Sequence, residues 1–397
     1  PVLVTMMAEM LNKGVVPVVP QKGSLGASGD LAPLAHMSLP LLGKGRAYYQ
    51  GVEMDGGEAM AKAGIQTLDT LVCKEGLGLT NGTCAMTSVG TLALYDTICA
   101  SQLADLIASM SMEALTGLLN AFDERVHAVR GHKGQLTVAK NFRLLTEGSE
   151  ILSNCQQDRV QDAYSLRCIP QVHGAIRDAI DYVKEKVSIE LNAVTDNPLV
   201  FLDDENVISG GNFHGEPMAL AFDFLGIACS EIADISERRT ERMVNAALSN
   251  GLTPFLTTEG GVNSGFMIVQ YAAASMVSEN KVLAHPASVD SIPSSAGQED
   301  HVSMGTIAAR KAGEIAKNVR RVLAMELMVA CQGIDMRGNK GLGKGTQAAY
   351  DLVRKQVATL DDDRELYGDI NYCEEIIANG SLIQAVEEAI GGAIETR

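Results

Sequence analysis

The 397-residue sequence contains no tryptophan and only 4% aromatic residues, and it is poor in positive charge. Its 32 lysines and arginines face 49 aspartates and glutamates, which gives a net charge of -17 and a pI of about 4.9. A field of this sign repels nucleic acid and anionic membrane surfaces, so we expect neither as a partner. A small zwitterionic substrate is compatible with the charge.

Signals for secretion, membrane crossing and metal binding are also missing. No signal peptide and no uninterrupted apolar run of membrane length appear within these 397 residues. Its eight cysteines form no C-x-x-C pair and lie mostly in apolar stretches, which favours buried thiols in a reducing cytoplasm. The seven histidines show no H-E-x-x-H or other metal-ligand spacing, so we expect no catalytic metal.

Long segments rich in Ala, Leu, Met and Ile, with little proline, dominate the chain. Their spacing predicts helices over residues 87–119, 172–191, 218–248, 264–283 and 302–331. With so few aromatic residues, such helices can approach closely in an all-α bundle. Strand signals are short, at residues 15–19 and in a hairpin over 198–209. The broad apolar faces indicate burial either against other subunits or in a thick monomeric core, and the pattern leaves both open.

Ala27-Ser28-Gly29 is the tripeptide with the most distinctive chemistry. In a strained turn, the Gly29 nitrogen can attack the Ala27 carbonyl carbon with loss of water. Elimination of the Ser28 hydroxyl then leaves an exocyclic methylidene. Gly29 lacks a Cβ that would obstruct the nitrogen, and Ser28 carries the leaving group on its β-carbon. The product is a methylideneimidazolone ring, an electrophile made without an added cofactor.

An ordinary helix N-cap is the alternative interpretation of these residues. Ser28 or Asp30 would then accept amide hydrogen bonds ahead of the apolar run LAPLAHMSLPLL. The longer string GSLGASGDLAPLAHMSLPLLGKG argues for more than a cap, because Gly23, Gly26 and Gly29 recur at every third position.

This string, from residue 23 to 45, resembles the prosthetic-group loop of the histidine and phenylalanine ammonia-lyase family, and the resemblance runs to the end of the chain. It implies an autocatalytic 4-methylidene-imidazol-5-one (MIO) group formed from Ala27, Ser28 and Gly29, with neither metal nor pyridoxal phosphate (PLP). It also implies the fumarase/aspartase-like helical fold and a homotetramer with shared active sites. We expect one ammonia-lyase region over 1–397, with the prosthetic-group region at 1–75 and the long-helix bundle and C-terminal helices at 76–397.

Two further motifs follow in the order that the family has. GLTNGT places Asn81 in a Gly-flanked turn at the start of a long helix, where its amide can reach a ligand or serve as a simple N-cap. In VQDAYSLRC, Gln161, Tyr164 and Arg167 recur at three-residue spacing and can point to one side of a helical turn. Arg167 suits a substrate carboxylate. The resemblance implies that Tyr164, as a catalytic residue, and Gln161 and Asn81 support the ring and the amine; a polar helix face is the alternative.

In this string Ala163 replaces the proline of the family, a loop change that we do not expect to affect the chemistry. The next motif is SGGNFHGEP, where the resemblance implies that Phe213 stands over the prosthetic ring and the substrate. A plain core aromatic is the alternative for Phe213, and we interpret His214 as structural. The Glu216-Pro217 pair predicts the start of a helix.

The stretch from residue 264 to 305 discriminates best between substrates. In histidine-specific members of the family, the residues that match Met267 and Glu299 contact the imidazole. Phenylalanine-type relatives typically read N-Q-D where this chain has Gln298-Glu299-Asp300. A carboxylate suits an imidazole N–H, whereas burying it unpaired beside a phenyl ring costs about 2 kcal/mol or more. A glutamate in a solvated loop is the alternative.

The resemblance thus implies a carbon–nitrogen lyase that eliminates ammonia from L-histidine to give trans-urocanate, the first step of histidine degradation. An ammonia-lyase acting on tyrosine or phenylalanine, or a 2,3-aminomutase, would use the same electrophile. A non-catalytic oligomeric scaffold is favoured if the tripeptide stays uncyclised. The string GNKGLGKGT at 338–346 suggests a phosphate loop, but Gly345 stands where Ser or Thr is needed and no strand precedes it.

The chain begins Pro1-Val2-Leu3, in a pattern typical of a helix already under way. We therefore expect a preceding segment or a companion N-terminal fragment. In the family, that segment carries the tyrosine proposed as catalytic base and a histidine that meets the imidazole. The 397 residues alone are expected to be inactive or severely impaired, which a urocanate assay with and without the segment would test.

Overall fold

A computed structural model describes residues 2–155 and 159–396 and confirms the all-α class with a few short strands. The chain forms two compact units, each made of three segments. Unit 1 comprises Pro1–Leu92, Glu185–Asp223 and Pro286–Arg310. Unit 2 comprises Ala93–Lys184, Phe224–His285 and Lys311–Arg397.

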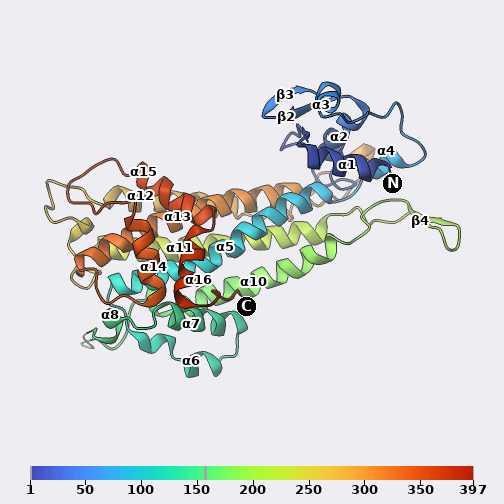
Figure 1. Ribbon diagram of the computed structural model, residues 1–397. Coiled ribbons are helices and arrows are strands. Elements are labelled where there is room, and N and C mark those ends of the chain that lie inside the picture. The colour runs from blue at the N-terminus through green and yellow to red at the C-terminus, as the bar shows by residue number, and fades with distance from the viewer. Residues whose placement is uncertain (1, 156–158, 397) are drawn as a thin grey trace. The chain divides into compact units, whose positions relative to one another are not determined.

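The secondary structure of the described residues is mostly helical (Figure 1). The α-helices are α1 (Val2–Lys13), α2 (Leu31–Ser38), α3 (Gly56–Lys62), α4 (Glu75–Thr80), α5 (Cys84–Ala114), α6 (Glu124–Ala128), α7 (Lys133–Leu145), α8 (Glu150–Ser153), α9 (Tyr164–Arg167), α10 (Ile169–Glu190), α11 (Glu216–Val244), α12 (Met267–Leu283), α13 (Gly305–Met336), α14 (Lys344–Arg354), α15 (Tyr367–Ala378) and α16 (Ser381–Ile390). The 3-10 helices are η1 (Leu39–Leu42), η2 (Leu119–Phe122), η3 (Pro254–Leu256) and η4 (Ser295–Gly297). The strands are β1 (Val16–Pro17), β2 (Arg46–Tyr49), β3 (Val52–Asp55), β4 (Leu199–Phe201) and β5 (Asn206–Ile208).

Unit 1 holds both small sheets. Strands β1, β2 and β3 form an antiparallel sheet in that order, with Val16 opposite Tyr48 and Arg46 opposite Asp55. Its inner residues belong to a core with Met6, Met10, Leu41 and Met60 from α1, η1 and α3. Flexible methionine side chains fill the irregular space between such short elements.

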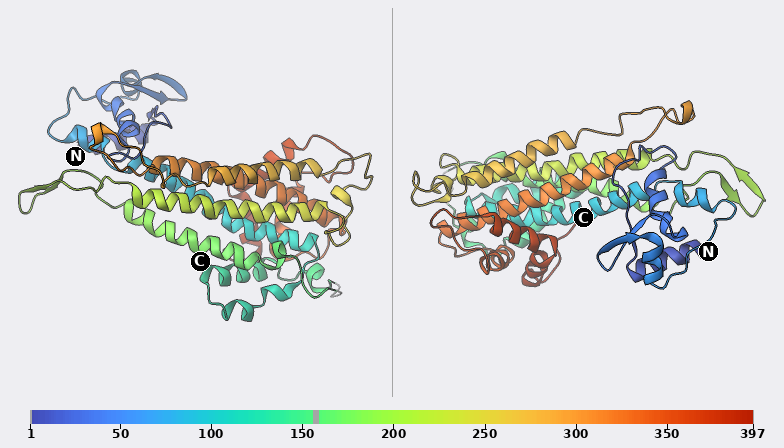
Figure 2. Two further views of the ribbon diagram at one scale, coloured as in Figure 1. Left: turned by 180° about the vertical axis from the view of Figure 1, so that it is seen from behind. Right: turned by 90° about the horizontal axis from the view of Figure 1, so that it is seen from above.

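Unit 2 is built on long helices. The turns of α5, α10, α11 and α13 that belong to this unit run alongside one another (Figures 1 and 2). At their centre, the fully buried Arg239 of α11 donates to both oxygens of Glu326 on α13, with an Nη2–Oε2 distance of 2.9 Å. Ser111 of α5 donates to the same carboxylate at 2.6 Å. A buried charge needs such partners, because removing one leaves the other uncompensated.

The predicted long helices are all present as α5, α10, α11, α12 and α13; their first residues differ from the prediction by two or three positions and their last residues by none to five. The expected hairpin over 198–209 is confirmed as β4 and β5. The hairpin of β2 and β3 was not predicted, although its Gln50-Gly51 turn has the two positive φ angles (50° and 79°) of a tight hairpin turn. The division of the chain at residue 75 stays a prediction.

Among residues 2–155 and 159–396, no helix combines the length and the apolar character that a membrane crossing requires.

Candidate active site

The Ala27-Ser28-Gly29 tripeptide lies in a tight, left-handed turn of unit 1. Gly26, Ser28 and Gly29 have φ angles of 83°, 49° and 80°. A positive φ is uncommon for a residue with a side chain, so Ser28 adopts a conformation that the neighbouring contacts must hold in place. The strained turn that the cyclisation chemistry requires is therefore present.

Backbone pairing with Gly82 holds this turn. Gly82 donates its N–H to the Ser28 carbonyl (3.0 Å) and accepts from the Asp30 N–H (2.8 Å). A Cβ on Gly29 would lie 2.0 Å from the Gly82 oxygen, and one on Gly82 would lie 2.4 Å from the Thr195 oxygen. The two backbones approach so closely that only glycine fits at either position.

Asp30 begins α2 but does not cap it with its side chain. Its fully buried carboxylate instead accepts from the Met86 amide (2.7 Å), from Ser24 Oγ (3.0 Å) and from Thr306 Oγ1. Burial raises the pKa of Asp30, and these hydrogen bonds offset only part of the increase. Asp30 is therefore not a side-chain N-cap of α2. Its carboxylate instead connects the turn to Met86 of α5 and Thr306 of α13.

Glu299 meets the tripeptide directly. Ser28 Oγ donates to Glu299 Oε1 at 2.8 Å, and Ser294 Oγ donates to Oε2 at 2.9 Å. Hydrogen bonds from Ser295, then Ser28, hold the pKa of the Glu299 carboxyl below its usual range. Glu299 is half-buried and ionised, with one oxygen at the serine that would lose its hydroxyl.

Asn81 and Phe213 also belong to unit 1. Asn81 is buried in the turn between α4 and α5, and its Nδ2 donates to Asp196 Oδ1 (3.0 Å). It caps no helix with its side chain, because α5 starts only at Cys84. Phe213 is half-buried in a turn three residues before α11, which starts at Glu216 as predicted.

The other predicted site residues belong to unit 2. Tyr164 and Arg167 form the two ends of the four-residue helix α9, with the Arg167 guanidinium 4.6 Å from the Tyr164 ring centre. Gln161 is exposed and precedes this helix, so the expectation of one helical face holding all three was wrong. The helix starts only at Tyr164 because the backbone of Ala163 is extended (φ -63°, ψ 159°), which leaves Gln161 outside it. Met267 is the first residue of α12 and is half-buried.

The residues present fit the ring that the resemblance implies. The positive φ angles bring the tripeptide into a tight turn, and a Cβ at Gly29 has no room. The buried Asn81 Oδ1 has no hydrogen-bond partner among the described residues. Buried polar atoms are usually paired, so this acceptor points to a hydrogen-bond donor on a ligand beside the turn, since the ring itself has no N–H or O–H.

The glycine-rich segment before α14 does not bind phosphate in this fold. The Gly343 amide, where a phosphate loop would offer its N–H, donates to Glu113 Oε1 at 2.8 Å. Glu113 is fully buried, and burial raises the pKa of its carboxyl. The protein's own carboxyl group thus occupies the position that an anion would take.

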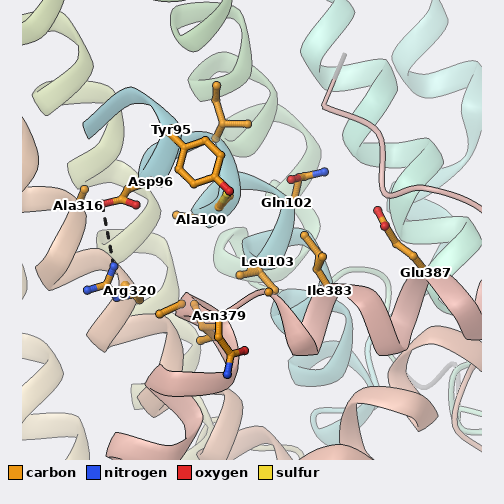
Figure 3. A pocket seen from close by; sticks show the side chains of 15 residues that line it. Tyr95, Asp96, Ala100, Gln102, Leu103, Ala316, Arg320, Asn379, Ile383 and Glu387 are labelled. Atoms are coloured by element: carbon orange, nitrogen blue, oxygen red, sulfur yellow. Dashed lines mark ion pairs between the residues drawn. The ribbon is translucent and has the colours of Figure 1, made fainter. Parts of the chain in front are cut away.

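A cavity of about 390 Å³ in unit 2 lies between α5, α13 and the α15–α16 segment (Figure 3). Its walls include Tyr95, Gln102 and Asn379, and none of the predicted site residues. Arg320, the cation at its edge, lies 4.0 Å from Asp96 and 3.3 Å from Glu374. Because Arg320 already pairs with these two carboxylates and Glu387 accepts from the Ile394 amide, we assign no site to the cavity.

Across residues 2–155 and 159–396, no three His, Cys, Asp or Glu side chains gather in a way that could hold a metal ion.

Sequence reasoning missed three residues around the turn: Asp30, Lys74 and Asp196. The sequence pattern indicates Asp30 only as a candidate N-cap. Asp196 lies in the string TDNPLV, where an Asp and an Asn directly before a proline indicate a fixed turn and could have marked it. Lys74 gave no signal, since a lone lysine in a loop is usually solvated.

Known proteins resemble this chain in sequence and in fold. The family model for aromatic amino acid lyases matches residues 1–355. A histidine ammonia-lyase of Alkaliphilus oremlandii is 61% identical over 384 residues, which cover 97% of this chain and 75% of that protein. The crystal structure of histidine ammonia-lyase from Trypanosoma cruzi has a TM-score of 0.91 and 42% identity, covering 98% of this chain and 73% of that one. The tyrosine aminomutase of Streptomyces globisporus has a TM-score of 0.94 and 36% identity, covering 100% and 78%.

Proposed function

The chain belongs to the aromatic amino acid lyase family, and from that premise we propose that it is a histidine ammonia-lyase. In this reaction the C–N bond of L-histidine breaks, a proton leaves the β-carbon, and trans-urocanate and ammonia are released. The fold is shared with an aminomutase at a TM-score of 0.94, so the fold alone does not choose the substrate. The 56–61% identity to proteins named histidine ammonia-lyase supports the choice.

We propose that Ala27, Ser28 and Gly29 form the MIO group autocatalytically. When present, the ring supplies an electrophilic methylidene carbon for removal of the amino group. Gly82 and Asp30 would hold it, through the backbone pairing and the buried network that fix the turn.

Glu299 recognises the imidazole in this proposal. Its lowered pKa keeps it a carboxylate, which accepts a hydrogen bond from an imidazole N–H. Met267 contacts the ring through its soft thioether side chain. Phe213 contributes an aromatic face to the substrate site.

The polar groups at the other end of the substrate have separate tasks. Arg167 binds the carboxylate with two parallel N–H groups. Tyr164, Gln161 and Asn81 hydrogen-bond near the prosthetic ring and the amine. Together these residues orient the C–N bond and the β-carbon before the reaction.

We propose a homotetramer whose active sites combine residues from several subunits. Exposed apolar side chains on long helices, such as Leu92, Leu220 and Ile227, support an oligomer. A cytoplasmic location is part of this proposal, and it accords with eight cysteines that are all free thiols.

The observation that carries the proposal is the 2.8 Å contact between Ser28 Oγ and Glu299 Oε1. It places the carboxylate that would bind imidazole next to the serine that would become the electrophile. The test is to give the purified full-length protein L-histidine, L-tyrosine and L-phenylalanine in turn and to identify the products. We expect trans-urocanate, seen by its ultraviolet absorbance, and an intact mass lower than the sequence mass by two waters.

The same experiment separates the competing functions. Cinnamate or coumarate as the main product would show that the substrate is phenylalanine or tyrosine and not histidine. A β-amino acid would indicate an aminomutase. A protein with the uncyclised mass and no turnover would favour the scaffold. Ser28→Ala is the control, because it has no hydroxyl to eliminate.

A further inference from the structure

Asp196, in the turn before β4, determines which way round the Asn81 amide lies. Asn81 Nδ2 donates to Asp196 Oδ1 (3.0 Å) and to the Asn197 carbonyl (3.3 Å). The nitrogen carries two hydrogens, and each has an acceptor. In the flipped amide, Oδ1 would face these two acceptors and could donate to neither. The two acceptors therefore fix the orientation of the amide, with Nδ2 toward Asp196 and Asn197.

Lys74 in turn fixes Asp196. Its ammonium forms an ion pair with Asp196 Oδ2, and both side chains are 29% exposed. Partial burial raises the pKa of Asp196, but hydrogen bonds from Lys74, Asn81 and the Asn197 amide outweigh it and keep the pKa below its usual range. Asp196 is therefore a carboxylate with both oxygens engaged.

The remaining atom of the amide, Asn81 Oδ1, is buried without a partner among the described residues, and Asn81 as a whole is 6% exposed. Leaving such a buried acceptor unsatisfied is unfavourable, because it has lost its hydrogen bonds to water. Asn81 directly precedes Gly82, whose backbone pairs with Ser28 and Asp30. The unsatisfied oxygen thus belongs to the residue adjoining the prosthetic-group turn.

We propose that Asp196, held by Lys74, is a positioning residue that makes Asn81 a hydrogen-bond acceptor for the amino group of the substrate. This rests on the proposed function. An amine or ammonium brings the N–H donor that Oδ1 lacks, whereas a substrate carboxylate brings only acceptors and is repelled. The α-amine is therefore bound at Asn81, and the carboxylate must be bound elsewhere.

Two ligands that differ in the amine test the proposal. In wild type, Asp196→Ala and Asp196→Asn, we would measure kcat and KM for L-histidine and the inhibition constant of imidazole-4-propionate, which lacks the amino group. Asp196→Ala is expected to lower kcat/KM at least tenfold while the inhibition constant changes less than twofold. Asp196→Asn, which still offers an oxygen to Asn81, is expected to retain more activity.

If Asp196→Ala impairs kcat/KM for L-histidine and the binding of imidazole-4-propionate to the same extent, Asp196 has a general structural role. If it changes neither, Asp196 has no role. Each result overturns the proposal. Asp204→Ala, in the exposed turn between β4 and β5, is the matched control and should change neither constant. Intact mass is recorded for every variant, so that loss of the MIO group is not mistaken for loss of amine binding.

An exchange of the two side chains keeps the test decisive where Asp196→Ala does not fold. Asn81→Asp alone sets two carboxylates against each other. The double variant Asn81→Asp/Asp196→Asn restores a donor–acceptor pair and still leaves an oxygen facing the substrate. We expect its kcat/KM to exceed that of Asn81→Asp at least threefold; equal or lower activity overturns the proposal.

The histidine assignment can fail without affecting this experiment. If the wild type processes another aromatic amino acid, the same ratio is measured with that acid and its desamino analogue. The amine, which all such substrates carry, is the group under test.

Discussion

At the scale of single residues, the site depends on two backbone segments that approach too closely to leave room for a side chain between them. Gly29 and Gly51 have nearly the same φ, 80° and 79°, yet they differ in their surroundings. A Cβ on Gly29 meets the Gly82 oxygen at 2.0 Å, whereas one on Gly51 meets nothing within 4 Å. Comparing substitutions at Gly29 and Gly51 therefore separates the effect of the positive φ from the effect of the close approach to Gly82.

We predict that Gly29→Ala prevents ring formation and lowers stability well beyond Gly51→Ala. Gly51→Ala carries only the left-handed penalty, about 1–2 kcal/mol. Gly29→Ala adds a clash with backbone that cannot rotate away. Intact mass and thermal unfolding of both variants provide the measurement, and equal unfolding temperatures with normal cyclisation of Gly29→Ala would refute the prediction.

Glu299→Gln is predicted to reduce kcat/KM for L-histidine about 10- to 100-fold, since a hydrogen bond to a charged group contributes about 1.5–3 kcal/mol. The amide can still accept from Ser28 Oγ, so the mass loss of two waters should persist. Glu205→Gln, in an exposed turn, is the control. A variant that keeps full histidine activity would remove Glu299 from substrate recognition.

At the scale of secondary-structure elements, a buried polar network joins α5, α7 and α10 within unit 2. Asp105 accepts from His173 Nδ1 (2.8 Å), Arg177 Nη2 (2.6 Å) and Asn141 Nδ2 (2.9 Å). Arg177 and Asn141 also donate to the Glu395 carbonyl, each at 2.8 Å. The network thereby attaches the segment after α16 to the long helices.

This network predicts a loss of stability in mild acid. Burial lowers the pKa of His173, and the Asp105 carboxylate offsets only part of that shift. Below the ordinary His pKa of about 6.5, the unfolded chain binds a proton that the folded protein does not. The free energy of unfolding should then fall as the pH falls, by up to about 1.4 kcal/mol per pH unit.

Burial raises the pKa of Asp105, but Arg177 and His173 outweigh it and lower the pKa overall, so its contribution is lost only at more acidic pH. Urea unfolding between about pH 5 and pH 8 tests the His173 effect. His173→Asn retains a donor to Asp105 without titrating and should flatten the pH dependence. The exposed His132→Asn should leave it unchanged, and identical slopes for all three proteins would contradict the prediction.

The elements also show what could be read from the sequence. The long helices were predictable, because a 3.6-residue apolar period persists over many turns. Their ends were not, since Asn81 was expected at the start of a long helix whereas α5 begins at Cys84. The contact of Ser28 with Glu299 spans 271 residues and arises only from tertiary packing, so no local pattern contains it. The resemblance supplied the candidate residues, whereas Lys74 and the contact of Asp196 with Asn81 required the structure.

At the scale of the whole molecule, the apolar residues on the surface need an explanation, given a net charge of -17. In unit 1, Val89 and Leu92 of α5 and Leu220 of α11 are 38%, 69% and 50% exposed. These helices pack closely there, since a Cβ on Gly90 would lie 2.0 Å from the Phe222 ring. Apolar residues on one pair of packed helices are typical of a subunit interface.

We predict that Leu92→Glu dissociates the proposed tetramer, because each copy would bury a charge in place of a side chain whose full burial contributes about 1.5–3 kcal/mol. The glutamate suits an exposed helix, so the monomer should keep its helical content. Light scattering after gel filtration gives the mass of the assembly, and circular dichroism checks the fold. Val129→Glu, at an 89% exposed position after α6, should leave the assembly intact. Since the proposed active sites are shared between subunits, Leu92→Glu should lose activity together with its assembly, and an active monomer would show that each chain holds a complete site.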